Sequence, residues 1–146
     1  MIEGVKVSTR RVISDPHGAV LHMLKPTDPD FAGFGEIYFS KIAVGQRKAW
    51  RRYHQATAQL VVPVGEVRFA LYDDRTSSLS AGSTGEFTLG ESSYQLLTIP
   101  PQIWFAFQNM GAVDALVANC SSLAHDPTKI DRQDLDGSTI PYIWRN

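Results

Sequence analysis

Short runs in which apolar and polar residues alternate recur along the chain, and they constrain the fold more than any other feature. The runs cover residues 5–13, 19–24, 36–44, 58–64, 66–72, 94–99, 103–107 and 114–120. A period of two places successive side chains on opposite faces of a β-strand. Segments rich in Gly and Pro, such as "SDPHG" at 14–18 and "KPTDPDFAGFG" at 25–35, separate the runs and favour turns. The pattern therefore predicts many short strands.

So many strands in 146 residues indicate a sandwich, a jelly roll or a barrel, because each strand must bury one face. The stretch "DPTKIDRQ" at 126–133 is the exception, since Asp126 and Pro127 suit the cap and first turn of a short helix. The serine-rich segment "TSSLSAGST" at 76–84 is predicted to be an exposed loop. No repeat or linker interrupts the chain, so residues 1–146 are predicted to form one domain.

Charge and cysteine content disfavour several classes of protein. Fourteen Lys and Arg residues balance fifteen Asp and Glu residues, so no strong field attracts nucleic acid or anionic membrane. The single cysteine, Cys120, excludes an internal disulfide and fits a reducing compartment. No apolar run approaches the roughly 20 residues of a spanning helix, and the first residues lack the apolar core of a signal peptide. We therefore predict a cytoplasmic protein without nucleic-acid or membrane partners.

A pair of glycines frames the segment that carries the functional hypothesis. Five residues separate Gly45 from Arg51, one separates Arg51 from Tyr53, four separate Tyr53 from Ala58, and six separate Ala58 from Gly65. This spacing resembles the first cupin motif, in which two histidines and a glutamate bind a metal ion. Arg51, Tyr53 and Ala58 stand at those three positions.

A second segment resembles the second cupin motif through Pro100, Gln102, Phe105 and Asn109, and Phe105 stands at its histidine position. Divalent ions of the cupin type need imidazole, thiolate or carboxylate donors that converge on one point. None of the four positions supplies such a donor. We therefore predict no metal at this site.

Over nearly its full length the chain is similar to the dTDP-4-dehydrorhamnose 3,5-epimerase family of cupins. The similarity rests on Asp15–Gly18, Lys48–Arg51, Gly65–Val67, Asp73–Arg75, Pro100–Phe107 and Trp144. It implies a cupin-type jelly-roll β-barrel, no cofactor, and a nucleotide-linked 4-keto-6-deoxy sugar as the ligand. It also implies a homodimer in which N-terminal strands join the partner's sheet.

The family's chemistry does not carry over to this chain. In the family, a histidine removes the proton beside the ketone, a lysine stabilises the enolate oxygen, and a tyrosine returns the proton. The resemblance places these roles on Arg51, Gln59 and Asn119. None of these side chains exchanges protons usefully near neutral pH. Epimerisation by the family's usual residues is therefore not expected.

Strand alternation then predicts the lining of the cavity. If Arg51 points inward, the matching parity includes Tyr53, Gln59, Phe69, Leu71, Phe105, Phe107, Val117 and Asn119. Within this largely apolar set, only Tyr53 could act as an acid or base, so it is the candidate catalytic residue. The predicted substrate-binding residues, taken from parity and resemblance together, are His17, Lys48, Arg51, Tyr53, Gln59, Phe105 and Asn119.

Several alternatives stay open at this point. Arg51 could lie at the barrel mouth and pair with Asp134 or Asp136, and Tyr53 and Phe105 could simply fill the core. The chain could be an isomerase or epimerase of nucleotide-linked 4-keto sugars that uses other residues. It could also be a catalytically silent sugar-nucleotide-binding protein, acting as a sensor or a partner subunit. A third possibility is a metal-dependent cupin with unusual ligands.

Overall fold

The computed structural model describes residues 1–146 throughout and contains twelve strands and one short 3-10 helix. The elements are β1 (Lys6–Thr9), β2 (Val12–Asp15), β3 (Gly18–Leu21), β4 (Glu36–Ile42), β5 (Arg47–Tyr53), β6 (Ala58–Val64), β7 (Glu66–Tyr72), β8 (Thr84–Gly90), β9 (Gln95–Ile99), β10 (Trp104–Asn109), β11 (Ala115–Ser121), η1 (Pro127–Lys129) and β12 (Ile130–Gln133). The prediction of an all-β fold is therefore confirmed.

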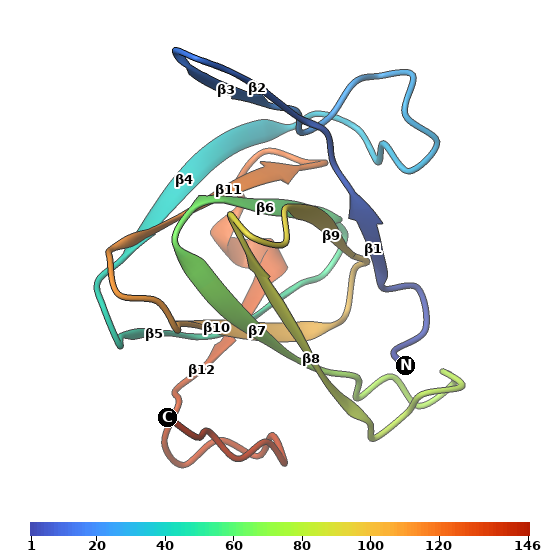
Figure 1. Ribbon diagram of the computed structural model, residues 1–146. Helices are drawn as coiled ribbons and strands as arrows, with labels where there is room; N and C mark the ends of the chain where they lie inside the picture. The colour runs from blue at the N-terminus through green and yellow to red at the C-terminus, as the bar shows by residue number, and fades with distance from the viewer.

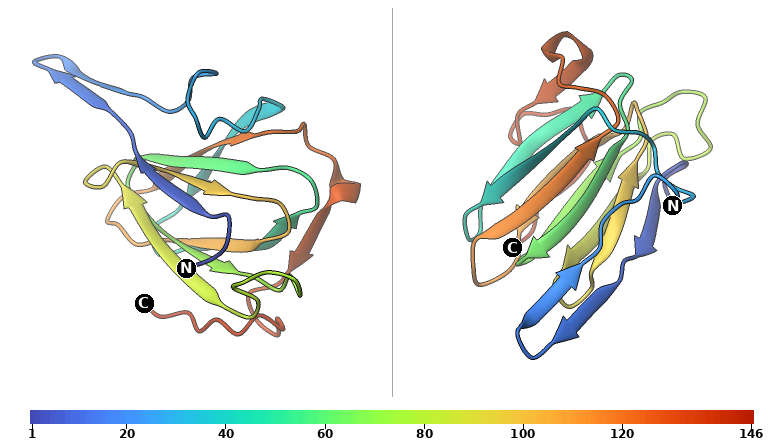
Figure 2. Two further views of the ribbon diagram at one scale, coloured as in Figure 1. Left: turned by 90° about the vertical axis from the view of Figure 1, so that its right-hand side faces the viewer. Right: turned by 90° about the horizontal axis from the view of Figure 1, so that it is seen from above.

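Ten of the strands form two antiparallel sheets that face each other. One sheet has the order β1-β9-β6-β11-β4, and the other has the order β12-β5-β10-β7-β8. Figure 1 shows the two sheets enclosing a common interior. The hairpin formed by β2 and β3 projects away from both sheets, whereas η1 and β12 lie at the opposite end of the molecule (Figure 2, left).

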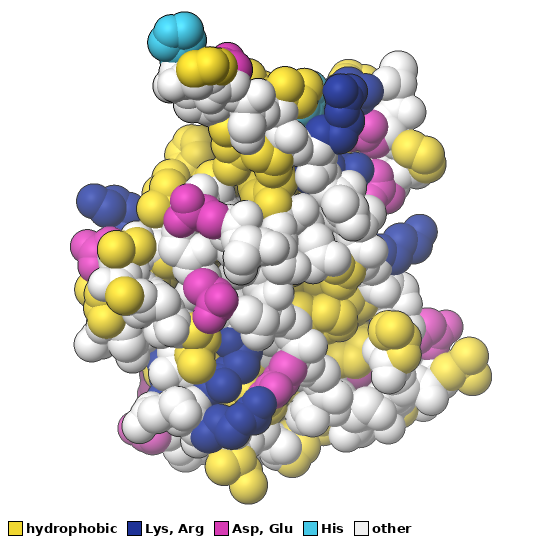
Figure 3. All heavy atoms as spheres, in the orientation of Figure 1, with side chains coloured by type: hydrophobic (Ala, Val, Ile, Leu, Met, Phe, Trp, Pro, Cys, Tyr) yellow, Lys and Arg dark blue, Asp and Glu magenta, His cyan; other side chains and the backbone are white.

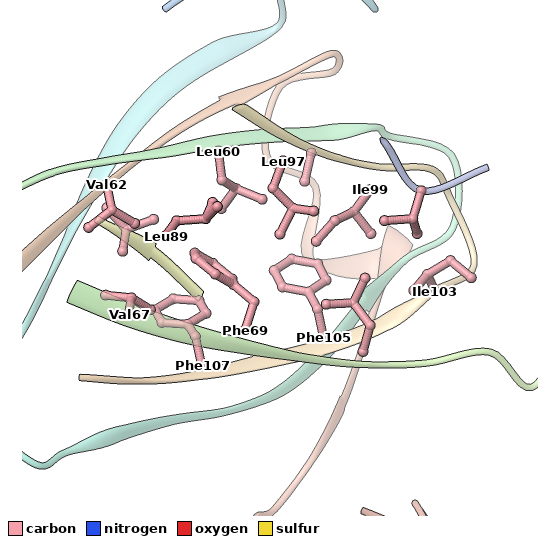
Figure 4. Close-up of a cluster of buried hydrophobic side chains, with 14 of the residues drawn as sticks. Leu60, Val62, Val67, Phe69, Leu89, Leu97, Ile99, Ile103, Phe105 and Phe107 are labelled. Atoms are coloured by element: carbon pink, nitrogen blue, oxygen red, sulfur yellow. The ribbon is translucent and has the colours of Figure 1, made fainter. Parts of the chain in front are cut away.

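The main core lies between the two sheets. Leu60, Leu97 and Ile99 from one sheet meet Phe69 and Phe105 from the other (Figure 4). All of them are at most 2% exposed. Burial of a side chain of this size stabilises a protein by about 1.5–3 kcal/mol, so this layer holds the two sheets together.

A second apolar cluster covers the outer face of the sheet that contains β5. Trp50 and Trp104 are buried there with Ile140, and the C-terminal residues Tyr142 and Trp144 pack against them. The ring centroid of Trp50 lies 5.9 Å from those of both Tyr142 and Trp144. The end of the chain therefore shields one face of this sheet from water.

Most of the strands lie where the alternation predicts them, but β5 lies outside the predicted runs and two further regions differ. The run at 5–13 is divided between β1 and β2, because the chain leaves the first sheet after Thr9. Strand β8 was not predicted, because its sequence "TGEFTLG" has few apolar residues, and only Leu89 and Gly90 within it are buried. β8 is an edge strand that pairs with β7 alone.

The prediction of a helix over 126–133 is wrong beyond its first turn. The side chain of Asp126 accepts a hydrogen bond from the Thr128 amide and caps η1, which spans only Pro127–Lys129. Residues from Ile130 onward are extended and pair with β5 as strand β12. Pairing with an exposed sheet edge thus outweighs the local helix signal. No helix in the structure is long and apolar enough to cross a membrane.

Candidate functional site

A cleft opens at the end of the sandwich where β4, β5 and β12 come together. It consists of two adjoining hollows of about 410 and 260 Å³, which we call the mouth cleft. Both hollows are lined by Glu36, Tyr53, His125 and Ile130. The larger one adds Tyr38, Arg51 and Arg132, and the smaller one adds residues of the loop that follows β11. This is the largest recess that joins apolar walls to converging polar groups.

Two tyrosine hydroxyls meet in the wall of the mouth cleft. The Tyr38 and Tyr53 oxygens are 2.5 Å apart, a short hydrogen bond in which either can donate. The Nδ2 of Asn119 donates to Tyr38 Oη at 2.8 Å and to Tyr53 Oη at 3.3 Å. The register explains the convergence, because Asn119 on β11 is paired with Tyr38 on β4 and both point inward.

Burial distinguishes the two tyrosines. Tyr53 is 7% exposed, and burial, reinforced by the neighbouring Tyr38 hydroxyl, raises the pKa of Tyr53 above its usual range. Tyr53 therefore stays protonated near neutral pH and does not act as a base there. Tyr38 is partly exposed and lies on the cleft side of the pair. Asn119 is 2% exposed, and its Oδ1 has no hydrogen-bond partner.

Arg51 points into the mouth cleft, which is the orientation that the parity argument took as its starting condition. Its Nη1 is 3.5 Å from Tyr38 Oη, and its guanidinium carbon lies 6.0 Å from the centre of the Phe105 ring. Its Nε is buried and has no hydrogen-bond partner. Neither Asp134 nor Asp136 forms an ion pair with it, so that alternative is excluded.

Strand β12, which forms one wall of the mouth cleft, is held in place from the outer face of the sheet. Asp131 accepts hydrogen bonds from Arg52 Nη2 at 2.5 Å and from His54 Nε2 at 2.8 Å. Arg52 also contacts both oxygens of Asp74 at 2.8 and 2.9 Å and lies over the ring of Trp104. This ionic network fixes the backbone that carries Arg132 into the cleft.

Phe105 and Lys48 lie on the inner face of their sheet but not in the wall of the cleft. The Phe105 ring packs edge to face against Tyr53 and is 1% exposed, so it forms the layer beneath the cleft. Lys48 is the cross-strand partner of Phe107, and a bulge separates that pair from the pair formed by Arg51 and Phe105. Phe105 thus fills the core, which was one of the alternatives left open.

The prediction that Gln59 lines the cavity is wrong. Its Nε2 donates to the Asp30 carbonyl at 2.7 Å and to Thr98 Oγ1 at 3.1 Å, and its Oε1 accepts from the Ala32 amide. These partners lie on the opposite face of the sheet from the main core, where Gln59 anchors the loop between β3 and β4. Ala58 and Leu60, its neighbours in β6, point inward instead. The prediction extended the alternation of β5 through the turn after Tyr53 into β6, but in β6 the even-numbered residues point inward.

His17 lies far from the cleft of its own chain. It occupies the turn of the β2–β3 hairpin, and its side chain is 94% exposed. Its amide donates to the Asp15 carboxylate, which stabilises the turn. Within one chain, the structure therefore does not bring His17 together with the other predicted site residues.

Sequence reasoning missed four polar residues of the larger hollow, namely Glu36, Tyr38, His125 and Arg132. Tyr38 could have been found, because alternation from Glu36 places both residues on one face of the predicted strand. The other two required knowledge of β12 and of the loop before it. His125 lies in that loop and Arg132 in the segment that was predicted to be helical.

The side chains at the four cupin ligand positions do not fit a divalent metal ion. Arg51, Tyr53, Ala58 and Phe105 offer no imidazole, thiolate or carboxylate. The structure also contains no group of three His, Cys, Asp or Glu side chains placed to hold an ion. We therefore derive no reaction step through a metal.

Comparison with solved structures and curated proteins places these features in context. No family model matches the chain. The chain superposes with a TM-score of 0.95 on a dTDP sugar isomerase from Desulfovibrio desulfuricans G20, with 42% identity over 98% of this chain and 92% of that one. It is 28% identical to the spore coat polysaccharide biosynthesis protein SpsL of Bacillus subtilis, over 99% of this chain and 97% of the relative.

A dTDP-4-dehydrorhamnose 3,5-epimerase from Elizabethkingia anophelis has the same fold, with a TM-score of 0.84 at 13% identity, over 99% of this chain and 83% of that one. The fold, the near-complete coverage and the 42% identity to the Desulfovibrio isomerase agree with the motifs read from the sequence. The chain belongs to the dTDP-4-dehydrorhamnose 3,5-epimerase-like family of sugar-nucleotide epimerases and isomerases.

Proposed function

We propose that the protein is an epimerase or isomerase of a nucleotide-linked 4-keto sugar in glycan biosynthesis. The observation that carries the proposal is the convergence of Tyr38, Tyr53, Asn119 and Arg51 on one wall of the mouth cleft. The sequence resemblance puts two of them, Arg51 and Asn119, at positions of the family's proton-transferring residues, and the chain is 42% identical to a dTDP sugar isomerase. The proposed ligand is a nucleotide sugar of the 4-keto class.

In this proposal Tyr38 exchanges a proton with the carbon next to the ketone, and Tyr53 supports it as a hydrogen-bond donor. Tyr38 faces the cleft and accepts a hydrogen bond from Asn119, while Tyr53 is held in its protonated form behind it. A tyrosine within hydrogen-bond reach of the reacting carbon can act as a general acid or base. With its oxygen ionised, Tyr38 takes the proton from the carbon and later returns it, while Tyr53 keeps its own proton and stabilises the Tyr38 oxyanion through the short hydrogen bond.

Arg51 has the electrostatic role in the proposed reaction. Removal of a proton beside a ketone places negative charge on the carbonyl oxygen, and a fixed cation in a partly dry site stabilises that charge. Arg51 is the charged group nearest to the tyrosine pair, through its contact with Tyr38. Lys48, on the same inner face, is proposed to meet the diphosphate of the ligand.

Deuterium exchange tests the proposal. dTDP- and GDP-linked 4-keto-6-deoxyhexoses are incubated with the protein in deuterated water, and uptake at C3 and C5 is followed by mass spectrometry and NMR. We expect wild-type exchange to fall at least about 100-fold in Tyr38→Phe, because general acid–base groups contribute about 10²–10⁴. Tyr94→Phe is the control, since Tyr94 lies outside the mouth cleft and its side chain forms no hydrogen bond. Absence of exchange with every sugar would refute catalysis.

The second proposed function is a silent sugar-nucleotide-binding protein. It is favoured by the loss of the family's usual base, lysine and tyrosine from positions Arg51, Gln59 and Asn119. Tight binding of a nucleotide sugar without deuterium uptake would support this alternative. Elemental analysis of the purified protein separately tests a metal-dependent cupin, because stoichiometric iron, zinc or manganese would overturn the metal-free reading.

We propose that the protein acts as a homodimer with a cupin-type jelly-roll barrel in each subunit. The β2–β3 hairpin exposes Val12, Ile13 and Val20, and the outer face of β4 exposes Ile37 and Phe39. Apolar side chains are visible beneath the hairpin in Figure 3. Sheet addition by this hairpin would bring His17 towards the partner's cleft. Sedimentation equilibrium tests the proposal, and a monomer at micromolar concentration would contradict it.

The proposed compartment is the cytoplasm, and no cofactor is proposed. The single cysteine is buried, and burial raises the pKa of the Cys120 thiol, so it gives no sign of a redox role. Activity of the purified protein without any added cofactor would support this part of the proposal.

A further inference from the structure

Two arginines face each other across neighbouring strands in the mouth cleft. Arg132 on β12 is the direct cross-strand partner of Arg51 on β5, so the two side chains point to the same face. Both line the larger hollow. Like charges placed directly opposite each other in a sheet destabilise it. The pairing therefore costs free energy in the unliganded protein.

No carboxylate compensates these two charges. Arg10, Arg52, Arg75 and Arg145 each form an ion pair with an Asp or Glu at 3.0 Å or less. Arg51 has only the 3.5 Å contact with Tyr38 and a buried Nε without a partner.

Arg132 resembles Arg51 in this respect, because it forms neither an ion pair nor a side-chain hydrogen bond. The other charged groups around the cleft do not change this picture. Glu36 lines both hollows but forms no ion pair with either guanidinium. Asp126 is occupied at the cap of η1, where it accepts from Thr128. Lys129 adds further positive potential. The cleft therefore has an excess of unpaired positive charge on its inner wall.

We infer that Arg51 and Arg132 form a binding site for a carboxylate on the sugar ring of the ligand. A guanidinium presents parallel N–H donors that match the two oxygens of a carboxylate, and two of them can hold both oxygens. Such a ligand would remove the repulsion between the two arginines and satisfy Arg51 Nε. The inference rests on the proposed function and narrows it to nucleotide-linked sugar acids.

The position of the site favours the sugar ring over the diphosphate as the source of the anion. Arg51 contacts Tyr38, which the proposed function places at the reacting carbon. A carboxylate attached to C5 lies one bond from a carbon beside the ketone, whereas the diphosphate is joined to C1 across the ring. A 6-deoxy sugar, the class expected from the sequence resemblance, has no anionic group to offer here.

Calorimetric titration with matched ligands tests this inference. UDP-glucuronate and UDP-glucose differ only in the carboxylate at C6, and D-glucuronate and D-glucose repeat the comparison without a nucleotide. We expect the wild type to bind each acid at least about tenfold more tightly than its neutral partner, since hydrogen bonds to charged groups contribute about 1.5–3 kcal/mol. Arg51→Gln and Arg132→Gln should each abolish that preference, and Arg132→Gln should leave binding of the neutral sugar within about twofold.

Arg11→Gln is the control, because Arg11 is exposed, forms no ion pair and lies outside the mouth cleft. Arg132 is also exposed, so Arg132→Gln tests the site even if Arg51→Gln does not fold. Equal binding of acid and neutral sugar by the wild type, or of neither, overturns the inference. The inference is also overturned if the variants lose affinity for UDP-glucuronate and UDP-glucose equally, because that result would assign the arginines to the diphosphate. If only the free sugar acid binds, through Arg132, the carboxylate site stands and the proposed function fails.

Discussion

Arg51 and Arg52 are neighbours on β5, yet the two faces of this strand serve different purposes. Arg52 points outward and contacts three carboxylate oxygens, two of Asp74 and one of Asp131. Arg51 points inward and contacts none. Trp50, beside Arg52, is covered by the C-terminal residues, whereas Tyr53, beside Arg51, opens onto the mouth cleft.

This difference separates stability from function within one strand. On the outer face Arg52 and His54 are paired with carboxylates, and these contacts hold the sheet and β12 together, although Trp144 Nε1 in the same layer has no hydrogen-bond partner. On the inner face the polar groups are incompletely paired, a state that costs stability unless a ligand completes it. Unsatisfied groups of this kind are concentrated at functional sites.

Removal of the outer aromatic anchor should have the largest effect. Trp50→Ala is expected to lower the free energy of unfolding by about 3–5 kcal/mol, because it leaves a cavity in a fully packed cluster. Tyr53→Phe, on the inner face, keeps the ring and should cost only about 1 kcal/mol. Urea unfolding monitored by far-UV circular dichroism measures both. Similar losses in the two variants would contradict the division between the faces.

The two arginines provide a closer comparison. Arg52→Gln should lower the free energy of unfolding by about 1–2 kcal/mol, because Asp74 and Asp131 lose a charged donor and Trp104 loses a cation above its ring. Arg51→Gln should change it by less than about 0.5 kcal/mol or raise it, because the repulsion from Arg132 disappears. Parallel urea titrations of both variants check this order. A larger loss in Arg51→Gln would mean that Arg51 supports the fold.

The sequence predicts the inner face of β5 well because alternation holds within one strand. Arg51 and Tyr53 both point inward as expected, and Asn119 joins them from β11. The same rule fails for Gln59, because a turn between β5 and β6 resets the parity. Which strands pair, and in which register, depends on packing between distant segments and leaves no local signal. Alternation puts Tyr38 on the same face as Glu36, but its contact with Asn119 depends on the pairing of β4 with β11.

The outer face could not have been predicted in the same way. Its network joins residues 77 to 79 positions apart, such as Arg52 with Asp131 and His54 with Asp131. Asp131 itself lay in a segment whose local sequence favours a helix. The segment becomes β12 because β5 offers an unpaired edge, and long-range pairing of this kind overrides local propensity.

The smallest expected effect concerns pH and the outer network. The hydrogen bond from His54, followed by that from Arg52, lowers the pKa of Asp131 below its usual value. A lowered folded-state pKa means that the contribution of Asp131 to stability is complete above its unfolded-state pKa of about 3.9. That contribution is lost as the pH falls through the folded-state pKa. Solvent screening of this partly exposed pair limits it to about 1 kcal/mol.

Asp131→Asn should therefore be less stable than the wild type at pH 6, and the gap should close below pH 4. Asp114→Asn is the control, because Asp114 is exposed and forms no ion pair. The difference in stability between Asp114→Asn and the wild type should not close below pH 4 in this way. Urea midpoints at pH 6, 4 and 3 measure the effect. A constant gap for Asp131→Asn would show that its carboxylate contributes through shape rather than charge, and the outer face would then owe its strength to Trp50 alone.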